Sequence, residues 1–195
     1  MKKLITILLA LVLMLACVSA FAAGQNIKLD DFTVKTIDGK DFTLSEALKD
    51  HDLVLINLWA TWCPPCKAEF PFLQEAWSKN KDRVAVIALS VEPTDTEAKL
   101  QSYARAMQLT FPIANVGRTG LDDFASSGIP TTVLVDREGS VASVEIGARF
   151  STQEFQTLFD QYMPADSSHH LFDFKQDFIR RGDRDRPETF ISAHP

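Results

Sequence analysis

The sequence predicts an α/β domain in three layers, α/β/α, in which a mixed central sheet lies between helical layers. Two almost uninterrupted apolar runs, Leu53–Trp59 and Val84–Val91, have the composition of strands that are buried on both faces. A helical stretch at about 65–79 lies between them, so that strand, helix and strand form a crossover unit. A further strand is predicted at Thr131–Asp136, and the alternating run Val141–Ile146 after it predicts an antiparallel strand that pairs back on it.

The first residues of the chain have the pattern of an export signal. Two lysines precede the apolar run Leu4–Ala16, and the small residues that follow end in Ala20-Phe21-Ala22, which fits an A-x-A cleavage site. We therefore predict that residues 1–22 are a signal peptide. The protein would then work outside the cytoplasm, in the periplasm or at the outer face of a bacterial membrane.

Two alternatives to cleavage stay open. Residues 4–23 are long enough, at about 20 residues, to remain as a membrane tether. Cys17 follows Leu15-Ala16 and could carry a lipid, although Met14 and Leu15 fit a lipoprotein signal poorly.

Length and composition fit one domain with a substantial core. The chain has 195 residues, of which 46% are hydrophobic and 24% charged. Its formal net charge is −6, and it becomes −8 without the two lysines of residues 1–22. Because an acidic surface repels phosphate backbones, we expect no nucleic-acid partner.

An N-terminal hairpin and a short helix are predicted before the first buried strand. Short alternating patches at 32–34 and 40–42 are separated by Asp38-Gly39, a dipeptide that is typical of hairpin turns. Thr43 and Glu46 have the spacing of a capping box, which predicts a helix to about residue 49.

A second crossover helix follows the strand at 84–91. Thr94 and Glu97 have capping-box spacing and predict its start. Apolar residues recur at helical spacing after it, at Leu100, Tyr103, Ala104 and Met107. A further strand is expected near 111–114, and a short helix at about 121–126 would end at Gly128.

A last helix closes the domain. Ser151 and Glu154 form a third capping-box pattern, and Pro164 ends the helix. One face of it is apolar, with Phe155, Leu158, Phe159 and Tyr162. We place the domain at residues 23–164 and predict that residues 165–195, which are dense in mixed charge, form a flexible C-terminal tail.

Two cysteines stand where the first buried strand meets the following helix. Cys63 and Cys66 close too short a loop to stabilise the fold as a staple, so their use is chemical. A helix N-terminus offers unpaired N–H groups and the positive end of the helix dipole, which stabilise a thiolate. We therefore predict a redox-active disulfide in which Cys63 is the nucleophile and Cys66 the resolving cysteine.

A zinc site is the alternative use of this cysteine pair. Zinc usually needs four protein ligands, and the sequence has neither a second C-x-x-C nor a suitably spaced Cys/His pair. The pair His169-His170 lies in the predicted tail and is more simply explained as solvated. We predict no metal site and no cofactor.

Three motifs resemble the thioredoxin superfamily and, more closely, the TlpA/ResA-like group of exported thiol:disulfide oxidoreductases. They are Trp62-Cys63-Pro64-Pro65-Cys66-Lys67, Glu69-Phe70-Pro71 and Gly128-Ile129-Pro130-Thr131. The resemblance covers about residues 27–163. It implies a thioredoxin-like three-layer fold with an N-terminal hairpin and an extra βα insertion.

The resemblance also implies roles for residues distant from the cysteines. Pro130 would follow a cis peptide bond and face the dithiol, and the Ile129 backbone would pair with an extended client segment. Asn57 takes the place of the buried aspartate of classical thioredoxins, and Glu69 matches the glutamate thought to handle protons in the TlpA/ResA-like group. A solvated carboxyl in the first turns of the helix is the alternative for Glu69.

The two prolines between the cysteines indicate the direction of electron flow. Neither Pro64 nor Pro65 has an N–H, so the Cys63 sulfur keeps few donors beyond the amide of Cys66. A less stabilised thiolate favours the disulfide form and a reducing potential, which predicts a reductase. The expected client-binding residues are Trp62, Pro64, Pro65, Ile129 and Pro130. Trp59 is also expected at the wall of the site, although a tryptophan at a strand end is ordinary core filler.

The resulting hypothesis is an enzyme that reduces disulfides in exported proteins and is re-reduced by a membrane thiol electron donor. By resemblance, its clients include apocytochrome c before haem attachment, or another oxidoreductase. A dithiol oxidase is one alternative. A peroxidase is disfavoured because Ile56 and Ala60 occupy the proline and threonine positions of P-x-x-x-T-x-x-C. A copper-binding or adaptor module is another alternative, although copper carriers of related fold generally show C-x-x-x-C.

Overall fold

A five-stranded mixed sheet forms the centre of the domain. In the computed structural model, which describes residues 27–117 and 119–163, the strand order is β5-β4-β3-β6-β7. The central strand β3 (Leu53–Trp59) pairs in parallel with β4 (Val84–Ser90) and antiparallel with β6 (Thr131–Asp136). The outer strands are β5 (Ile113–Asn115), parallel to β4, and β7 (Val141–Ile146), antiparallel to β6.

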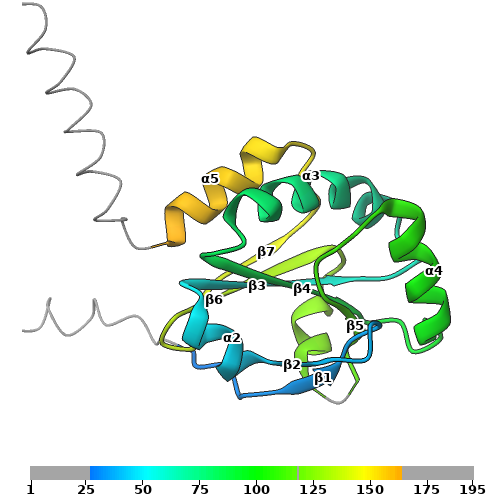
Figure 1. Cartoon of the computed structure of the whole chain (residues 1–195), viewed down its shortest axis with the longest axis horizontal. Coiled ribbons are helices and arrows are strands. Elements are labelled where there is room, and N and C mark those ends of the chain that lie inside the picture. Colours follow the sequence, from blue (N-terminus) through cyan, green and yellow to red (C-terminus); the bar gives the residue numbers. More distant parts are fainter. Residues whose placement is uncertain (1–26, 118, 164–195) are drawn as a thin grey trace, which may run out of the picture. The chain divides into compact units, whose positions relative to one another are not determined.

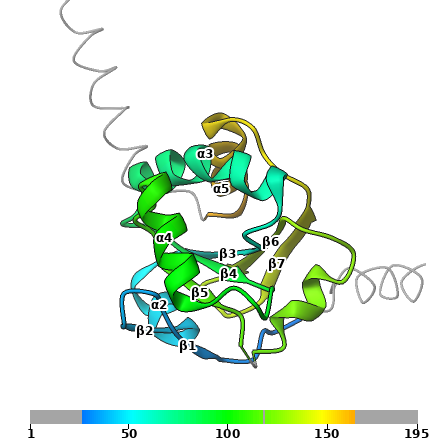
Figure 2. The same ribbon diagram turned by 90° about the vertical axis from the view of Figure 1, so that its right-hand side faces the viewer.

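The remaining elements form two layers on the faces of this sheet (Figure 1). Three helices lie on one face: α3 (Pro64–Asn80), α4 (Glu97–Met107) and α5 (Thr152–Tyr162). The other face carries the hairpin β1 (Thr33–Lys35) and β2 (Asp41–Thr43), α2 (Leu44–Asp50) and the 3-10 helix η1 (Leu121–Ala125). The view of Figure 2 shows the same separation, with α3 and α5 on the opposite side of the sheet from α2 and the hairpin.

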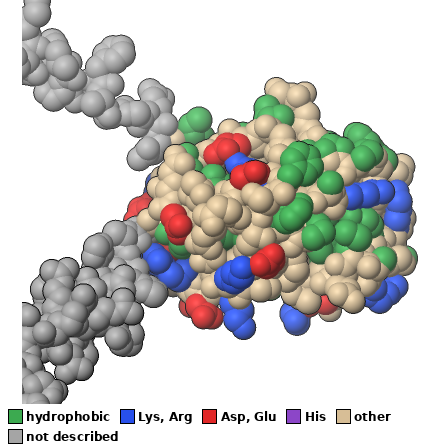
Figure 3. All heavy atoms as spheres, turned by 90° about the horizontal axis from the view of Figure 1, so that it is seen from above, with side chains coloured by type: hydrophobic (Ala, Val, Ile, Leu, Met, Phe, Trp, Pro, Cys, Tyr) green, Lys and Arg blue, Asp and Glu red, His purple; other side chains and the backbone are tan. Residues whose placement is uncertain are grey.

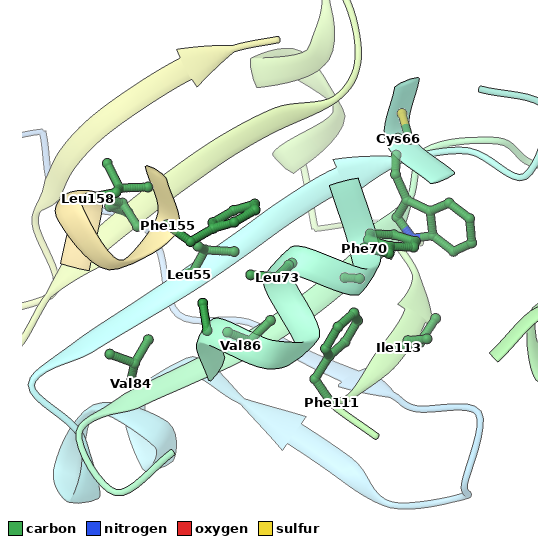
Figure 4. Packing of buried hydrophobic residues seen from close by; sticks show 14 of the residues in the cluster. Leu55, Cys66, Phe70, Leu73, Val84, Val86, Phe111, Ile113, Phe155 and Leu158 are labelled. Atoms are coloured by element: carbon green, nitrogen blue, oxygen red, sulfur yellow. The ribbon is translucent and has the colours of Figure 1, made fainter. Parts of the chain in front are cut away.

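Side chains along the buried strands point alternately to the two faces of the sheet, and both faces are covered, which explains why these sequences are apolar throughout. Leu53 and Leu55 of β3 pack in the cluster under α3 and α5, whereas Val54 and Ile56 pack in the cluster on the hairpin side. Because both faces are covered, every residue of β3 and β4 is buried. Figure 4 shows the first cluster, in which Phe70 of α3 and Phe155 of α5 meet the sheet.

The predicted fold class is confirmed, including the mixed sheet, the N-terminal hairpin and the extra strand and helix at α4 and β5. The bounds of β3, β6 and β7 are those predicted. The signal peptide, Cys17 and the tail at 165–195 lie outside the described residues. Within the described ranges, no helix has the length and the apolar content needed to cross a bilayer.

Two of the three predicted capping boxes are wrong. The Thr43 hydroxyl makes no cap; it forms a hydrogen bond of 2.8 Å with the Thr33 hydroxyl across the hairpin. The Asp31 carboxylate instead accepts the Ser45 N–H at the start of α2. A local pattern could not reveal this, because the competing partner lies in another element.

The second error concerns the start of α4. Thr96, not Thr94, is the N-cap, and its hydroxyl accepts the Lys99 N–H at 3.3 Å. The Thr94 hydroxyl donates to the Glu92 carboxylate instead. The third box is confirmed in its main bond, because the Ser151 hydroxyl accepts the Glu154 N–H.

The true cap of α4 can be tested by a pair of substitutions. Thr96→Ala removes the acceptor for a helix N–H and should lower the free energy of unfolding by about 1 kcal/mol. Thr94→Ala removes an exposed hydroxyl and its hydrogen bond to Glu92, but no acceptor for a helix N–H, and should cost less than about 0.5 kcal/mol. Urea unfolding followed by circular dichroism measures both, and equal losses would contradict the assignment of Thr96.

Candidate functional site

The two cysteines form a disulfide at the N-terminus of α3. Cys63 is the N-cap residue, and its Sγ accepts the N–H of Cys66 at 3.2 Å. Pro64 and Pro65 occupy the first two helical positions, so neither supplies an N–H to this sulfur. Cys63 is 2% exposed and Cys66 is fully buried, so Cys63 is the more accessible of the two. Figure 4 shows Cys66 near the start of the helix that carries Phe70 into the core.

A loop from the other end of the sequence lies against the disulfide. The Ile129–Pro130 peptide bond is cis, as the resemblance implies. The carbonyl oxygen of Ile129 lies 3.8 Å from Cys63 Sγ. Gly147, just after β7, donates its N–H to the Pro130 carbonyl at 2.9 Å, which ties this loop to the edge of the sheet. The structure therefore brings the cysteines and the Ile129–Pro130 segment together.

Glu69 is a buried carboxyl on the same helix. It is 0% exposed, which rules out a solvated carboxyl at this position. Its Oε1 accepts the Asn57 side-chain N–H at 2.8 Å, and its Oε2 accepts the main-chain N–H of Arg149 at 3.2 Å. Burial raises the pKa of Glu69 to about 7, against the smaller lowering effects of Asn57 and Arg149. Glu69 can therefore gain or lose a proton near neutral pH.

Arg149 makes its hydrogen bond to Glu69 through its main-chain N–H, and its positive charge also lowers the pKa of Glu69. Its guanidinium forms an ion pair with Glu145 and lies 5.5 Å from the centre of the Phe155 ring. Arg149 was not predicted from the sequence. No local pattern could have done so, because this residue is 80 positions from Glu69.

The two tryptophans near the cysteines have different environments. Trp59 is fully buried, with its ring centre 4.8 Å from that of Phe70 and 5.2 Å from that of Tyr103, so it belongs to the core rather than to the wall of the site. Trp62 is 60% exposed, and its Nε1–H donates to the Glu92 carboxylate at 2.8 Å. Trp62 is thus the tryptophan that a client could contact.

A second buried carboxylate lies on the loop that precedes α4. Asp95 is 2% exposed and accepts both the main-chain N–H and the hydroxyl of Thr61, at 2.9 and 2.5 Å. Burial alone would raise the pKa of Asp95, but hydrogen bonds from its side-chain donors outweigh it and place the pKa below its ordinary value. Asp95 is therefore an anion next to the turn that leads to Cys63.

Glu92 and Asp95 were not predicted from the sequence, although one signal pointed to them. They follow β4 just as Cys63 follows β3, and the two strands are parallel. The carboxyl ends of parallel strands meet at the same edge of a sheet, where sites of α/β proteins form. Polar residues after β4 could therefore have been expected beside the dithiol.

The surface over α3 and α5 has no uniform charge on the side seen in Figure 3. Acidic and basic side chains are interspersed there, and hydrophobic side chains gather in one part of the face. Among the described residues, no group of three or more His, Cys, Asp or Glu side chains is placed to hold a metal ion. The Cys63–Cys66 disulfide supports dithiol chemistry at this site.

Comparison with known proteins gives a matching family and similar curated proteins. Residues 25–144 match the AhpC/TSA family. The thioredoxin-like protein YneN of Bacillus subtilis is 31% identical over 130 residues, 66% of this chain and 75% of YneN. The thiol-disulfide oxidoreductase ResA of Bacillus cereus is 32% identical over 125 residues, 63% of this chain and 70% of ResA.

A solved structure agrees with these matches. The crystal structure of a thiol:disulfide interchange protein of the thioredoxin family from Chlorobium tepidum superimposes with a TM-score of 0.61 at 25% identity. The match covers 73% of this chain and 100% of that protein.

Proposed function

Because the chain belongs to the AhpC/TSA family and is a thiol:disulfide oxidoreductase, we propose that it reduces disulfides of proteins outside the cytoplasmic membrane. The observation that carries this proposal is the Cys63–Cys66 disulfide at the N-terminus of α3, with the Ile129–Pro130 loop against it. This arrangement gives one cysteine that is slightly exposed, one that is fully buried and a backbone segment for the client.

In the proposed reaction the reduced dithiol transfers two electrons to the client. The Cys63 thiolate attacks one sulfur of the client disulfide, and the other client sulfur leaves as a thiolate. A mixed disulfide then joins Cys63 to the client. Cys66 loses its proton and attacks Cys63 Sγ, which releases the second client thiolate and leaves the Cys63–Cys66 disulfide. The client is reduced and the enzyme is oxidised.

We propose that the Glu69 carboxylate accepts the proton that Cys66 loses before its attack. A general base works best when its pKa lies near the working pH, and the pKa of Glu69 is about 7. Glu69 follows Cys66 by three positions on α3, so both lie on one side of the helix. Asn57 and the Arg149 N–H hold the carboxyl in place. Of these two, Asn57 stands at the position that the resemblance assigns to the buried aspartate of classical thioredoxins.

The contacts of the Cys63 sulfur support reduction rather than oxidation of clients. It accepts one N–H, from Cys66, and the two prolines supply none. The Ile129 carbonyl oxygen, 3.8 Å away, is an acceptor and cannot stabilise a thiolate. A poorly stabilised thiolate makes the dithiol a better electron donor.

The N-terminal pattern supports the proposed location and partners. A signal at residues 1–22, or a tether at 4–23, would place the domain outside the cytoplasm, where proteins carry disulfides. The oxidised enzyme then needs a membrane thiol donor to be reduced again. We propose disulfide-containing exported proteins as clients, with apocytochrome c as the first to test.

The reduction potential of the Cys63–Cys66 pair tests the direction of electron transfer between enzyme and client. We expect a value near that of thioredoxin, about −270 mV, when the protein is equilibrated with dithiothreitol or glutathione buffers. A value near that of DsbA, about −120 mV, would instead assign the protein as an oxidase.

A further inference from the structure

We propose that Asp95 and Glu92 are positioning residues of this enzyme, which fix the turn before Cys63 and hold the Trp62 indole as a rigid contact surface for the client. The proposal rests on the proposed function and names what orients the client at the same site. It concerns the turn at residues 60–63, which is closed by a hydrogen bond of 3.0 Å from the Cys63 N–H to the Ala60 carbonyl. Thr61 and Trp62 are the two central residues of this turn.

Asp95 holds the first of these central residues. Oδ2 accepts the Thr61 N–H at 2.9 Å and the Ser90 hydroxyl at 2.7 Å, and Oδ1 accepts the Thr61 hydroxyl at 2.5 Å. Lys99 of α4 donates to Oδ1 at 2.5 Å and balances the charge. The side chain of Asp95 is fully buried, so its bonds to Thr61 and Ser90 are protected from water, whereas the Lys99 side chain is 48% exposed. The carboxylate thus joins the turn to β4 and to α4.

Glu92 holds Trp62, the second central residue of the turn. Its Oε2 accepts the Trp62 Nε1–H at 2.8 Å, while its Oε1 accepts the N–H and the hydroxyl of Thr94 at 3.0 and 2.7 Å. The Glu92 main chain is fixed as well, since its carbonyl accepts the Asp95 N–H. Two acids of one loop therefore hold both central residues of the turn.

An indole that is fixed before binding should bind a client more tightly than an exposed hydrophobic residue on a mobile turn. Trp62 is 60% exposed and directly precedes the nucleophile, so a client that reaches Cys63 meets this ring. A side chain held before binding loses less conformational entropy when the client docks. The expected consequence is a lower KM for protein disulfides. A small disulfide that touches only the sulfur gains little.

Two substrates separate positioning from chemistry. The reduced protein is assayed with insulin, a protein disulfide, and with bis(2-hydroxyethyl) disulfide, which has no surface for Trp62. Asp95→Asn leaves one acceptor oxygen in place of two and turns an NH2 group toward the donors. We expect it to lower kcat/KM for insulin by about tenfold, mainly through KM, and to change the rate with the small disulfide by less than about twofold. Glu92→Gln should lower kcat/KM for insulin by about threefold.

Asp52→Asn is the matched control. Asp52 is also a largely buried acid with two basic partners, Arg83 at 2.7 Å and Arg137, but it precedes β3 and so lies at the opposite end of that strand from the dithiol. It should change kcat/KM for insulin by less than about twofold. An equal loss in Asp52→Asn would show a general effect of stability and would overturn the proposal.

A double-mutant cycle with Trp62→Ala decides whether the acids act through the indole. In the Trp62→Ala background, Asp95→Asn and Glu92→Gln should each lower kcat/KM for insulin by less than about twofold further, because the ring they position is gone. Full additivity, or an equal loss with the small disulfide, would overturn the proposal. If Asp95→Asn does not fold, the cycle with the more accessible Glu92 decides alone. A wild-type protein that reduces neither substrate would reject the proposed function itself.

Discussion

A Cys66→Ser variant is expected to accumulate as a mixed disulfide with its client, and a Cys63→Ser variant is expected to lose disulfide reduction. The physical reason is the order of the two attacks. Cys63 is the helix N-cap and the more accessible sulfur, so it attacks the client first. Without the Cys66 thiol, nothing resolves the Cys63–client bond. Without the Cys63 thiolate, the first bond does not form, and the rate should fall by a factor on the order of 10³ or more.

The measurement uses insulin reduction for the rate and non-reducing gels with mass spectrometry for the trapped adducts. The double variant Cys63→Ser/Cys66→Ser is the control, because an uncleaved chain still contains Cys17 and could form adducts there. Adducts that persist in the double variant belong to Cys17. Trapping by Cys63→Ser in place of Cys66→Ser would reverse the assigned roles, and trapping by neither would argue against a covalent exchange.

Local patterns predicted the elements whose formation depends on burial along the strand or helix. The bounds of β3 were readable because both faces of that strand are covered, so all seven residues are apolar or, at Asn57, buried within the site. The position of the two cysteines could be predicted because a strand that leads directly into a helix N-terminus is a local feature of the sequence. Capping failed at Thr43, where the hydroxyl bonds to Thr33 of the hairpin partner strand.

Contacts between distant segments were not readable in the same way. Asp95 is 34 positions from Thr61, and Glu69 is 80 positions from the Arg149 N–H. These bonds exist because β3, β4 and the segment after β7 are brought to one edge of the sheet. Sequence reasoning identified Glu69 only through resemblance, and it could not predict that the carboxyl would be fully buried. That burial raises the pKa of Glu69 and should make the stability of the protein depend on pH.

Glu69→Gln is expected to change how the stability of the oxidised protein depends on pH. Burial raises the pKa of Glu69 from its ordinary 4.5 to about 7, so between these values the folded protein holds a proton that the unfolded chain releases. The free energy of unfolding therefore falls as pH rises from 4.5 to 7. The loss is complete above pH 7, and the pKa difference corresponds to about 3 kcal/mol. Glutamine carries no titrating proton, so the variant should lack this loss.

Urea unfolding of the oxidised protein at pH 5 and pH 8 measures the effect, since disulfide-bonded cysteines do not titrate. Glu75→Gln is the matched control: Glu75 is an exposed glutamate on the same helix, and hydrogen bonds from Lys79 and Thr152 lower its pKa. It should retain the wild-type fall in stability between the two pH values. The same fall in Glu69→Gln would mean that another group is responsible.

The same substitution tests whether Glu69 serves the reaction as well as the fold. If Glu69 takes the proton of Cys66, the rate of client release should rise with pH through about 7 in the wild-type protein, as the carboxyl loses its own proton. Glu69→Gln should remove this rise and lower the rate by about 10². A variant that loses the pH dependence of stability but keeps the wild-type rate profile would leave Glu69 as a buried acid without a part in proton transfer. Loss of both the pH dependence of stability and the pH dependence of the rate would show that the same buried carboxyl takes the proton of Cys66.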